Sequence, residues 1–292
     1  MTSLRVFYGH HKCATGWITE NLREMVFHLG LRHHIVHLPE HYAAYGSLEG
    51  LVTATSADLL FYTNATIDQA RTLRPHRGLH VVRDPRDILV SAYFSHLHSH
   101  PTDEWSALEA HRRELQGMTK EEGLRHELAF SRPQFDSMMA WDYDQPHVLE
   151  MKMETLTADP LRHFTSIADF FGWLDGPEDR GLRRVGRLAQ LRLNRLNQKG
   201  RRFMPGSVPM FPVPKRRMAT MPRSELARIV DRKSFRRLSG GRTKGQENVK
   251  SHYRKGVPGD WANHFSDDLR ARFKKRHGDL LIRLGYETDL HW

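Results

Sequence analysis

A short apolar run, a tight loop and a helical pattern follow one another at the N-terminal end of the chain. Residues 4–8 (LRVFY) are mostly apolar, the run stops at Gly9, and apolar residues recur at helical spacing from Trp17 to Leu29. This order predicts a strand, a turn and a helix start. Small residues let backbone N–H groups approach an anion, a helix N-terminus favours negative charge, and Lys12 adds a cation. The segment therefore predicts a phosphate or sulfate site, the alternative being an ordinary turn with a solvated lysine.

The same order of apolar runs and helical patterns continues along the chain. Further strands are predicted at residues 34–37, 58–62, 79–82 and 147–152. Strands that alternate with helices indicate an α/β fold, here a single domain (residues 1–292) with a central, mainly parallel sheet flanked by helices. Ligands of such sheets lie beyond the carboxyl ends of the strands, where both the Lys12 loop and the turn at Arg83 are expected.

The second motif is the turn at residues 83–87 (RDPRD), which leads into a helical pattern. Pro85 suits the first turn of a helix, Asp84 can cap that turn, and Asp87 lies favourably near its positive end. The two acidic residues therefore have structural explanations. Arg83 ends a buried strand, where an unpaired guanidinium is costly, so it needs an anion. That anion is either Asp87 or a phosphate of a ligand.

The composition limits the classes of protein to which the chain can belong. A formal net charge of +11 suggests an anionic partner, such as a nucleic acid, a membrane surface or a polyanionic small molecule. A single cysteine, Cys13, excludes an internal disulfide, and the sequence has neither a transmembrane run nor a signal-peptide pattern. A cytoplasmic protein is expected. Residues 197–217, rich in proline, glycine and basic residues, are predicted to form an irregular lid loop.

A third motif lies at residues 254–265 (RKGVPGDWANHF). Residues 12–17 (KCATGW), 83–97 and 254–265 occur in the order, and at about the separations, of the motifs of sulfotransferases that use 3′-phosphoadenosine-5′-phosphosulfate (PAPS). The chain resembles this cytosolic-type family over essentially its whole length. The first loop is not a Walker A motif, because no glycine directly precedes Lys12. The resemblance implies a P-loop-kinase-like sulfotransferase fold.

The resemblance also implies a reaction and a set of site residues. The sulfuryl group of PAPS would move to a hydroxyl or amine of a small-molecule acceptor by in-line displacement, without a metal, leaving 3′-phosphoadenosine-5′-phosphate (PAP). Lys12 would neutralise charge on the leaving group. The N–H groups of Ala14, Thr15 and Gly16, together with the Thr15 hydroxyl, would bind the 5′-phosphate. Trp17 would stack on the adenine. Contacts to the 3′-phosphate are implied for Arg83, Ser91, Arg254, Lys255 and Gly256. Ser234 and Phe235 match a Ser-Phe pair that the family has near the nucleotide.

The sequence departs from the family pattern at several places. Asn64 stands where the family has its general-base histidine, and an amide cannot act as a base. Gly16 replaces the usual second threonine, and the family's C-terminal dimer motif is absent, which leaves the oligomeric state open. The candidate replacement bases lie beside the loop or in the expected acceptor pocket, and they are His11, His37, His41 and His100. A carboxylate such as Asp68, or an acceptor that ionises unaided, is the alternative.

Other functions are also weighed from the sequence. None of the 20 histidines belongs to a recognised metal-binding spacing, so they are interpreted as surface or hydrogen-bonded side chains. A nucleotide-dependent small-molecule kinase would need a Walker A loop and a clear set of Mg²⁺-binding acids. A basic nucleic-acid-binding protein would use residues 183–250, which lack interleaved aromatic residues. The sulfotransferase hypothesis, with no nucleic-acid partner and an acceptor that the sequence does not identify, is preferred.

Overall fold

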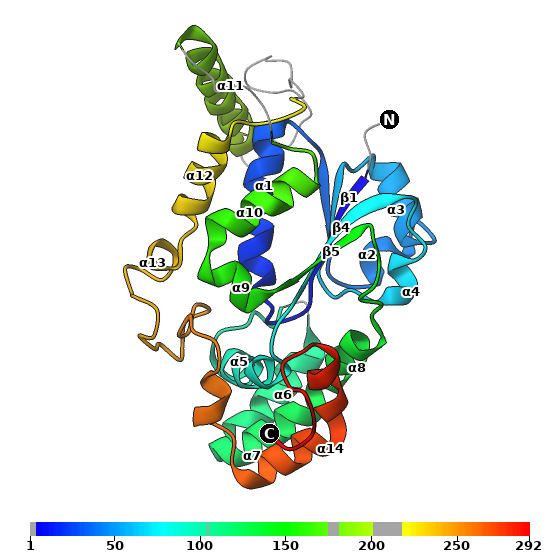
Figure 1. Cartoon of the computed structure of the whole chain (residues 1–292), viewed down its shortest axis with the longest axis vertical. Coiled ribbons are helices and arrows are strands. Elements are labelled where there is room, and N and C mark those ends of the chain that lie inside the picture. The colour runs from blue at the N-terminus through cyan, green and yellow to red at the C-terminus, as the bar shows by residue number, and fades with distance from the viewer. Residues whose placement is uncertain (1–3, 104, 175–180, 201–217) are drawn as a thin grey trace.

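A parallel sheet is the central element of the chain, of which the computed structural model describes residues 4–103, 105–174, 181–200 and 218–292 (Figure 1). The five strands have the order β2-β3-β1-β4-β5, and every neighbouring pair is parallel. They are β1 (Leu4–Tyr8), β2 (His33–Val36), β3 (Leu59–Tyr62), β4 (His76–Val82) and β5 (Val148–Lys152). The predicted α/β fold with a mainly parallel sheet is confirmed, and the loops that follow the strands leave from one edge.

Helices cover both faces of the sheet (Figure 1). One face carries α1 (Thr15–Leu29), α9 (Met153–Ala158), α10 (Pro160–Phe170) and α12 (Arg223–Arg232). The other face carries α2 (Glu40–Ala43), α3 (Leu48–Thr55) and α4 (Ile67–Ala70). Successive side chains of a strand point to opposite faces, and accordingly Phe7 belongs to the core on the first face and Tyr8 to the core on the second.

A third group of helices lies beyond the carboxyl ends of the strands (Figure 1). It consists of α5 (Pro85–His98), α6 (Ser106–Gln116), α7 (Lys120–Phe130), α8 (Arg132–Ala140) and α14 (Asp267–Arg283). This helical layer has a core of its own, which includes Leu89, Leu124, Phe135 and Phe273. The loops that carry the predicted site residues therefore lie between the sheet and the helical layer.

Three shorter or peripheral elements complete the described chain. They are α11 (Gly181–Gly200), α13 (Phe235–Leu238) and the 3₁₀ helix η1 (Asp260–Asn263). Residues 197–200 of the predicted lid belong to α11, and residues 201–217 lie outside the described residues, so the lid stays a prediction. Among the described residues, no helix has the length and apolar character needed to cross a bilayer.

Candidate active site

The loop between β1 and α1 is held against the end of β3 by backbone hydrogen bonds. The Gly9 N–H donates to the Tyr62 carbonyl at 2.9 Å, and the Gly9 carbonyl accepts from the Ala65 N–H at 3.1 Å. A Cβ at Gly9 would lie 2.8 Å from Thr15 Cγ2, so glycine is needed where the chain turns back toward the helix start. The predicted order of strand, turn and helix is confirmed here.

Two non-glycine residues of this loop have left-handed backbone conformations. Lys12 has a φ of 64° and Ala14 a φ of 56°, an unfavourable state that is typical of functional loops. Such turns direct successive N–H groups into one concavity. No described side chain caps α1, so its first N–H groups are available to an anion. Thr15 Oγ1 donates to the His10 carbonyl at 2.6 Å, so this hydroxyl hydrogen is used inside the loop rather than offered to a phosphate.

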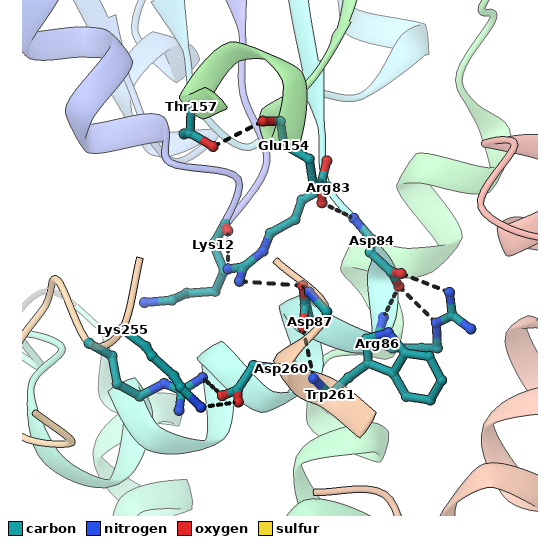
Figure 2. Close-up of polar contacts among 12 residues, drawn as sticks. Lys12, Arg83, Asp84, Arg86, Asp87, Glu154, Thr157, Lys255, Asp260 and Trp261 are labelled. Carbon is teal, nitrogen blue, oxygen red and sulfur yellow. Dashed lines mark hydrogen bonds and ion pairs between the residues drawn. The ribbon is translucent and has the colours of Figure 1, made fainter. Parts of the chain in front are cut away.

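Arg83 lies directly after β4 and is almost completely buried, with 8% of its surface exposed. Its Nη1 donates to the Lys12 carbonyl at 3.1 Å, so the second motif supports the first (Figure 2). Nη2 lies 3.9 Å from Asp87 Oδ2, and Nε is buried without a hydrogen-bond partner among the described residues. A buried guanidinium N–H without an acceptor is costly. This atom therefore fits an anionic group that a ligand supplies.

The carboxylate of Asp87 fastens the third motif to the second. Its Oδ2 accepts from the Gly259 N–H at 2.7 Å, and its Oδ1 accepts from the Trp261 N–H at 2.9 Å (Figure 2). Burial raises the pKa of Asp87, and the charge of Arg83 and these two hydrogen bonds oppose that effect. Both oxygens of Asp87 thus bind backbone groups, and the contact of Arg83 Nη2 with Oδ2 is long, at 3.9 Å. Of the two anions considered from the sequence, Asp87 therefore meets Arg83 only at this distance.

The remaining residues of the second motif have a structural role. Asp84 accepts from the Arg86 N–H at 2.9 Å, which confirms the predicted helix cap, and it binds the Arg86 guanidinium through both oxygens. That guanidinium contacts two aromatic rings, 4.0 Å from the centroid of Trp261 and 4.5 Å from that of Trp292. Arg86 thus joins the turn to the last part of the chain by cation–π contacts, and Arg83 is left for a ligand.

Arg254 and Lys255 of the third motif converge on one carboxylate. Arg254 Nη2 and Lys255 Nζ each lie 2.5 Å from an oxygen of the buried Asp260 (Figure 2). The Arg254 guanidinium also lies over the ring of Phe94, 4.7 Å from its centroid, one turn after Ser91 on α5. Protein anions therefore position this pair of cations beside the helix that carries Ser91, whose side chain is half-buried.

Gly256 and Phe235 form a close contact between the third motif and α13. Gly256 has a φ of 72°, and a Cβ there would lie 2.5 Å from the Phe235 ring, so glycine is needed on both counts. Ser234 is the residue before α13, and its side chain is half-buried. Trp17 Nε1 donates to the Lys233 carbonyl at 2.7 Å. Helix α1 and the third motif therefore both contact the short segment formed by residues 233–235.

The second and third residues of α1, Gly16 and Trp17, have different surroundings. Gly16 is exposed, and a Cβ added there would meet only His252 Nε2, at 3.9 Å, within the described chain. Trp17 is half-buried, and its ring meets that of Phe164 edge to face at a centroid distance of 5.3 Å. The space beside Gly16 suits a bound group, whereas stacking of Trp17 on adenine stays a prediction.

Lys12 is surrounded by other cations. Burial, together with the charges of Arg83 and Arg254, lowers the pKa of the Lys12 ammonium from 10.5 to about 7, although Glu127 acts in the opposite direction. An anion bound among these three cations would relieve their repulsion. The neighbouring Cys13 is buried, and burial raises the pKa of its thiol, so it packs as a small apolar residue rather than acting as a nucleophile.

Two of the four candidate base histidines lie beside this loop. The rings of His11 and His100 have centroids 4.9 Å apart, and the charge of Lys12 acts on both. Burial is the main cause that lowers the pKa of His11 well below its usual value and that of His100 to about 4.

The other two candidates lie together after β2. His41 Nδ1 accepts from the His37 N–H at 3.2 Å, and His37 Nδ1 lies 2.6 Å from Thr63 Oγ1. The amide of the exposed Asn64 donates to the His37 carbonyl at 2.9 Å, so it holds this segment. The structure therefore groups His37 and His41 with Asn64, and groups His11 and His100 with Lys12.

Three residues of this region were not predicted from the sequence. The charge of Lys12 acts on the exposed His252, and His96 and Glu127 form a buried network behind His11. Residues 96–100 attract attention as a histidine-rich run, but nothing in it distinguishes His96. Within the described residues, three groups of histidines and carboxylates are close enough to hold an ion, and hydrogen bonds or ion pairs already join members of each.

The arrangement of elements is similar to that of solved sulfotransferases. The structure of mouse sulfotransferase SULT7A1 complexed with PAP matches with a TM-score of 0.53 at 14% identity, over 95% of this chain and 84% of that chain. Retinol dehydratase in complex with androsterone and inactive cofactor PAP also matches, with a TM-score of 0.44, 14% identity and coverages of 95% and 80%. A sulfotransferase from Alicyclobacillus acidocaldarius matches with a TM-score of 0.33 at 13% identity, over 71% of this chain and 98% of that chain.

Comparisons of sequence give no match: no protein-family model fits the chain, and no curated protein is significantly similar to it. At 14% identity, the match to SULT7A1 is evidence of a shared fold. The sulfotransferase fold expected from the three sequence motifs is therefore confirmed.

Proposed function

We propose that this chain, which has the fold of the sulfotransferases, transfers the sulfuryl group of PAPS to a hydroxyl or amine of a small-molecule acceptor. The observation that carries the proposal is the buried Arg83 Nε, which has no acceptor among the described residues. The uncapped N-terminus of α1 lies beside it, because Arg83 donates to the Lys12 carbonyl. Two anion sites at one edge of the sheet suit a nucleotide with phosphates at both its 5′ and 3′ positions. PAP in the structure of SULT7A1 is such a nucleotide.

The proposed nucleotide contacts fall on two sides. The N–H groups of Ala14, Thr15 and Gly16 bind the 5′-phosphate at the positive end of α1, and Trp17 packs against the adenine. The 3′-phosphate is bound by groups from β4, α5 and the third motif, namely Arg83, Ser91, Arg254, Lys255 and Gly256. Ser234 and Phe235 belong to this second side, since the Phe235 ring packs on Gly256.

Lys12 acts through charge in this proposal. PAPS, when bound, supplies an activated sulfuryl group. In-line transfer of such a group asks little covalent chemistry of the protein, so positioning and charge neutralisation supply most of the catalysis, as in phosphoryl transfer. Lys12 places an ammonium at the start of α1, where it neutralises negative charge on the leaving group. No metal is part of the proposal.

Transfer of labelled sulfate tests the proposed function directly. The chain is incubated with ³⁵S-labelled PAPS and a panel of phenols, alcohols and primary amines, and in parallel with γ-³²P-labelled ATP. We expect label on one or more acceptors from PAPS and none from ATP. Label from ATP alone would instead make the chain a kinase. Salt-sensitive RNA binding that PAP does not alter, without transfer of either label, would indicate a nucleic-acid-binding protein.

Two arginines of the same strand region provide a matched pair for this test. Arg83→Ala removes the buried guanidinium, and we expect PAP affinity to fall at least tenfold, since a hydrogen bond to a charged group contributes about 1.5–3 kcal/mol. Arg77→Ala removes an exposed arginine of β4 that donates to the Phe170 carbonyl. Its PAP affinity should stay that of the parent chain, and equal losses in both variants would contradict the role of Arg83.

A further inference from the structure

His11, beside Lys12 in the first loop, begins a buried chain of hydrogen bonds that the nucleotide contacts do not use. Its Nε2 lies 2.9 Å from Nε2 of His96, and His96 Nδ1 lies 2.9 Å from Oε2 of Glu127. The planes of the His11 and His96 rings are nearly parallel, at 16°, with centroids 5.0 Å apart. His96 is 1% exposed and Glu127 is 0% exposed. The chain of bonds therefore runs from the loop into the interior of the helical layer.

Glu127 is an ionised carboxylate that accepts three hydrogen bonds. His111 Nε2 lies 2.8 Å from the same Oε2 that meets His96, and Ser131 Oγ donates to Oε1 at 2.6 Å. Burial alone would raise the pKa of Glu127, but the positive charge that His96 carries when protonated and the hydrogen bonds from His111, His96 and Ser131 lower it to about 2. An ionised carboxylate has no proton to donate, so His96 Nδ1 carries one.

The positions of the remaining ring protons follow from that carboxylate. With its Nδ1–H directed to Glu127, a neutral His96 has a bare Nε2, which must accept the hydrogen bond from His11. His11 then carries its proton on Nε2, and its Nδ1 keeps a lone pair. This Nδ1 makes no hydrogen bond within the described part of the chain and is not among its buried unpaired atoms. His11 thus offers a basic nitrogen beside Lys12.

The groups around His11 favour passing a proton onward. Burial and the charges of Lys12, His96, His100 and His252 lower the pKa of His11 well below its usual value. When His11 gains a proton at Nδ1, the positive charge is more stable on His96 than on His11, because His96 lies next to the Glu127 carboxylate. Movement of the Nε2 proton of His11 to His96 Nε2 places the positive charge there and leaves His11 neutral.

We propose that His11 is the catalytic base for the acceptor, and that His96 and Glu127 are positioning residues that take up its proton. This inference rests on the proposed sulfuryl transfer. The acceptor's lone pair forms the bond to sulfur while the bond from sulfur to the nucleotide oxygen breaks. The acceptor's O–H or N–H proton moves to His11 Nδ1, and the Nε2 proton of His11 moves to His96 Nε2. After the product leaves, the proton returns through His11 to water.

A second series of hydrogen bonds, also made by two histidines and a glutamate, provides a matched control. His10 Nε2 lies 2.8 Å from His80 Nε2, and His80 Nδ1 lies 2.6 Å from Glu150 Oε2. His10 is 2% exposed, which closes it to an acceptor. Burial raises the pKa of Glu150 to about 8, so its carboxyl group is mostly protonated at neutral pH. The chain from His10 to Glu150 therefore lacks both access and the negative charge that the chain from His11 to Glu127 has.

Imidazole ¹⁵N NMR of the whole chain tests the proton positions without any reaction. At pH 7.5 we expect the Nε2–H tautomer for His11 and the Nδ1–H tautomer for His96, with signals assigned by their loss in His11→Gln and His96→Gln. A His11 ring protonated on Nδ1 would overturn the proposal. This measurement does not depend on PAP binding or sulfate transfer, so failure of the proton chain and failure of the proposed function are distinguishable.

Turnover tests the proposed roles of His11 and Glu127. It is measured as the PAP released from PAPS, with an acceptor identified by the labelled-sulfate test or with water. Glu127→Gln keeps an acceptor for His96 but removes its charge, and we expect turnover to fall roughly 10- to 100-fold with PAP affinity unchanged. His11→Ala should lose about 10²- to 10⁴-fold and recover in part with added imidazole. The control Glu150→Gln should keep the turnover of the parent chain. Equal losses in Glu127→Gln and Glu150→Gln, without imidazole rescue, would contradict the proposal.

Discussion

Lys12 is the side chain whose removal should separate catalysis from binding. It lies near the start of α1, close to Arg83 and Arg254, and in the proposed role its ammonium neutralises negative charge on the leaving group. A group that acts mainly in the transition state lowers turnover without an equal loss of ground-state affinity. We therefore expect Lys12→Ala to lower turnover by about 10²-fold or more, with a smaller change in PAP affinity by calorimetry. Lys152→Ala, which removes a lysine bonded to the Gly285 carbonyl, is the control. An unchanged turnover number would refute the role of Lys12.

The pKa of Lys12 also predicts that nucleotide binding takes up a proton. In the protein without ligand its pKa is about 7, so at pH 8 the side chain is mostly neutral. A bound phosphate favours the charged form and raises the pKa again, so PAP binding recruits a proton and its affinity falls as pH rises above 7. Calorimetry at pH 8 in buffers of different ionisation enthalpy measures this uptake. Lys12→Met should reduce it, and an identical uptake in both proteins would contradict the prediction.

Individual site residues could be predicted where the sequence places them in a motif. Arg83 follows an apolar strand directly, and its need for an anion could be argued before the structure was known; the structure leaves its Nε without a partner among the described residues. Glu127 gave no such signal, because α7 has the charged composition of a surface helix and its burial depends on contacts with α5 and α6. The sequence contains no local signal for contacts between residues 16 or 31 positions apart.

The contact between the third motif and α13 can be tested with two glycines. Gly256 and Gly259 both have positive φ, but a Cβ at Gly256 would meet the Phe235 ring at 2.5 Å, whereas at Gly259 it would meet nothing within 4 Å in the described chain. Both alanine variants carry a backbone cost of roughly 1–3 kcal/mol. We expect Gly256→Ala to lose more stability and more PAP affinity than Gly259→Ala, by thermal melting and calorimetry. Equal effects of the two variants would show that the Phe235 contact is unimportant.

Strands were easier to predict than short helices. Strands of a parallel sheet are buried on both faces and appear as apolar runs, so β1 and β3 were found within one residue. β4 begins three residues before its predicted start, because it opens with the polar segment His76–Gly78. His76 is accommodated there by the Tyr8 hydroxyl at 2.6 Å, a contact between strands distant in sequence. Helices α2 and α4 have four residues each, too few to show a helical period.

Binding of PAP should raise the melting temperature of the whole molecule. The proposed ligand joins the sheet, the helical layer and the third motif, and at about 100 times its dissociation constant it should add roughly 2.7 kcal/mol to the free energy of unfolding. Adenosine 5′-phosphate is the matched control, and we expect it to bind far more weakly because it leaves Arg83 and Arg254 without the 3′-phosphate. Differential scanning fluorimetry measures both. No shift at millimolar PAP would argue against the nucleotide assignment.

The hydrogen bond between Asp87 and Gly259 spans 172 positions of the sequence. At a synthesis rate of about 5–20 residues per second, the ribosome makes the second motif roughly 10 to 30 s before the segment that completes it. During that interval the nascent chain has Arg83 but neither Arg254 nor Lys255. Under the proposed function, a nucleotide would meet only part of its site during that interval. Its full stabilising effect would begin once the third motif has left the exit tunnel and docked, so products that end before that point would gain less protection from the ligand against proteases.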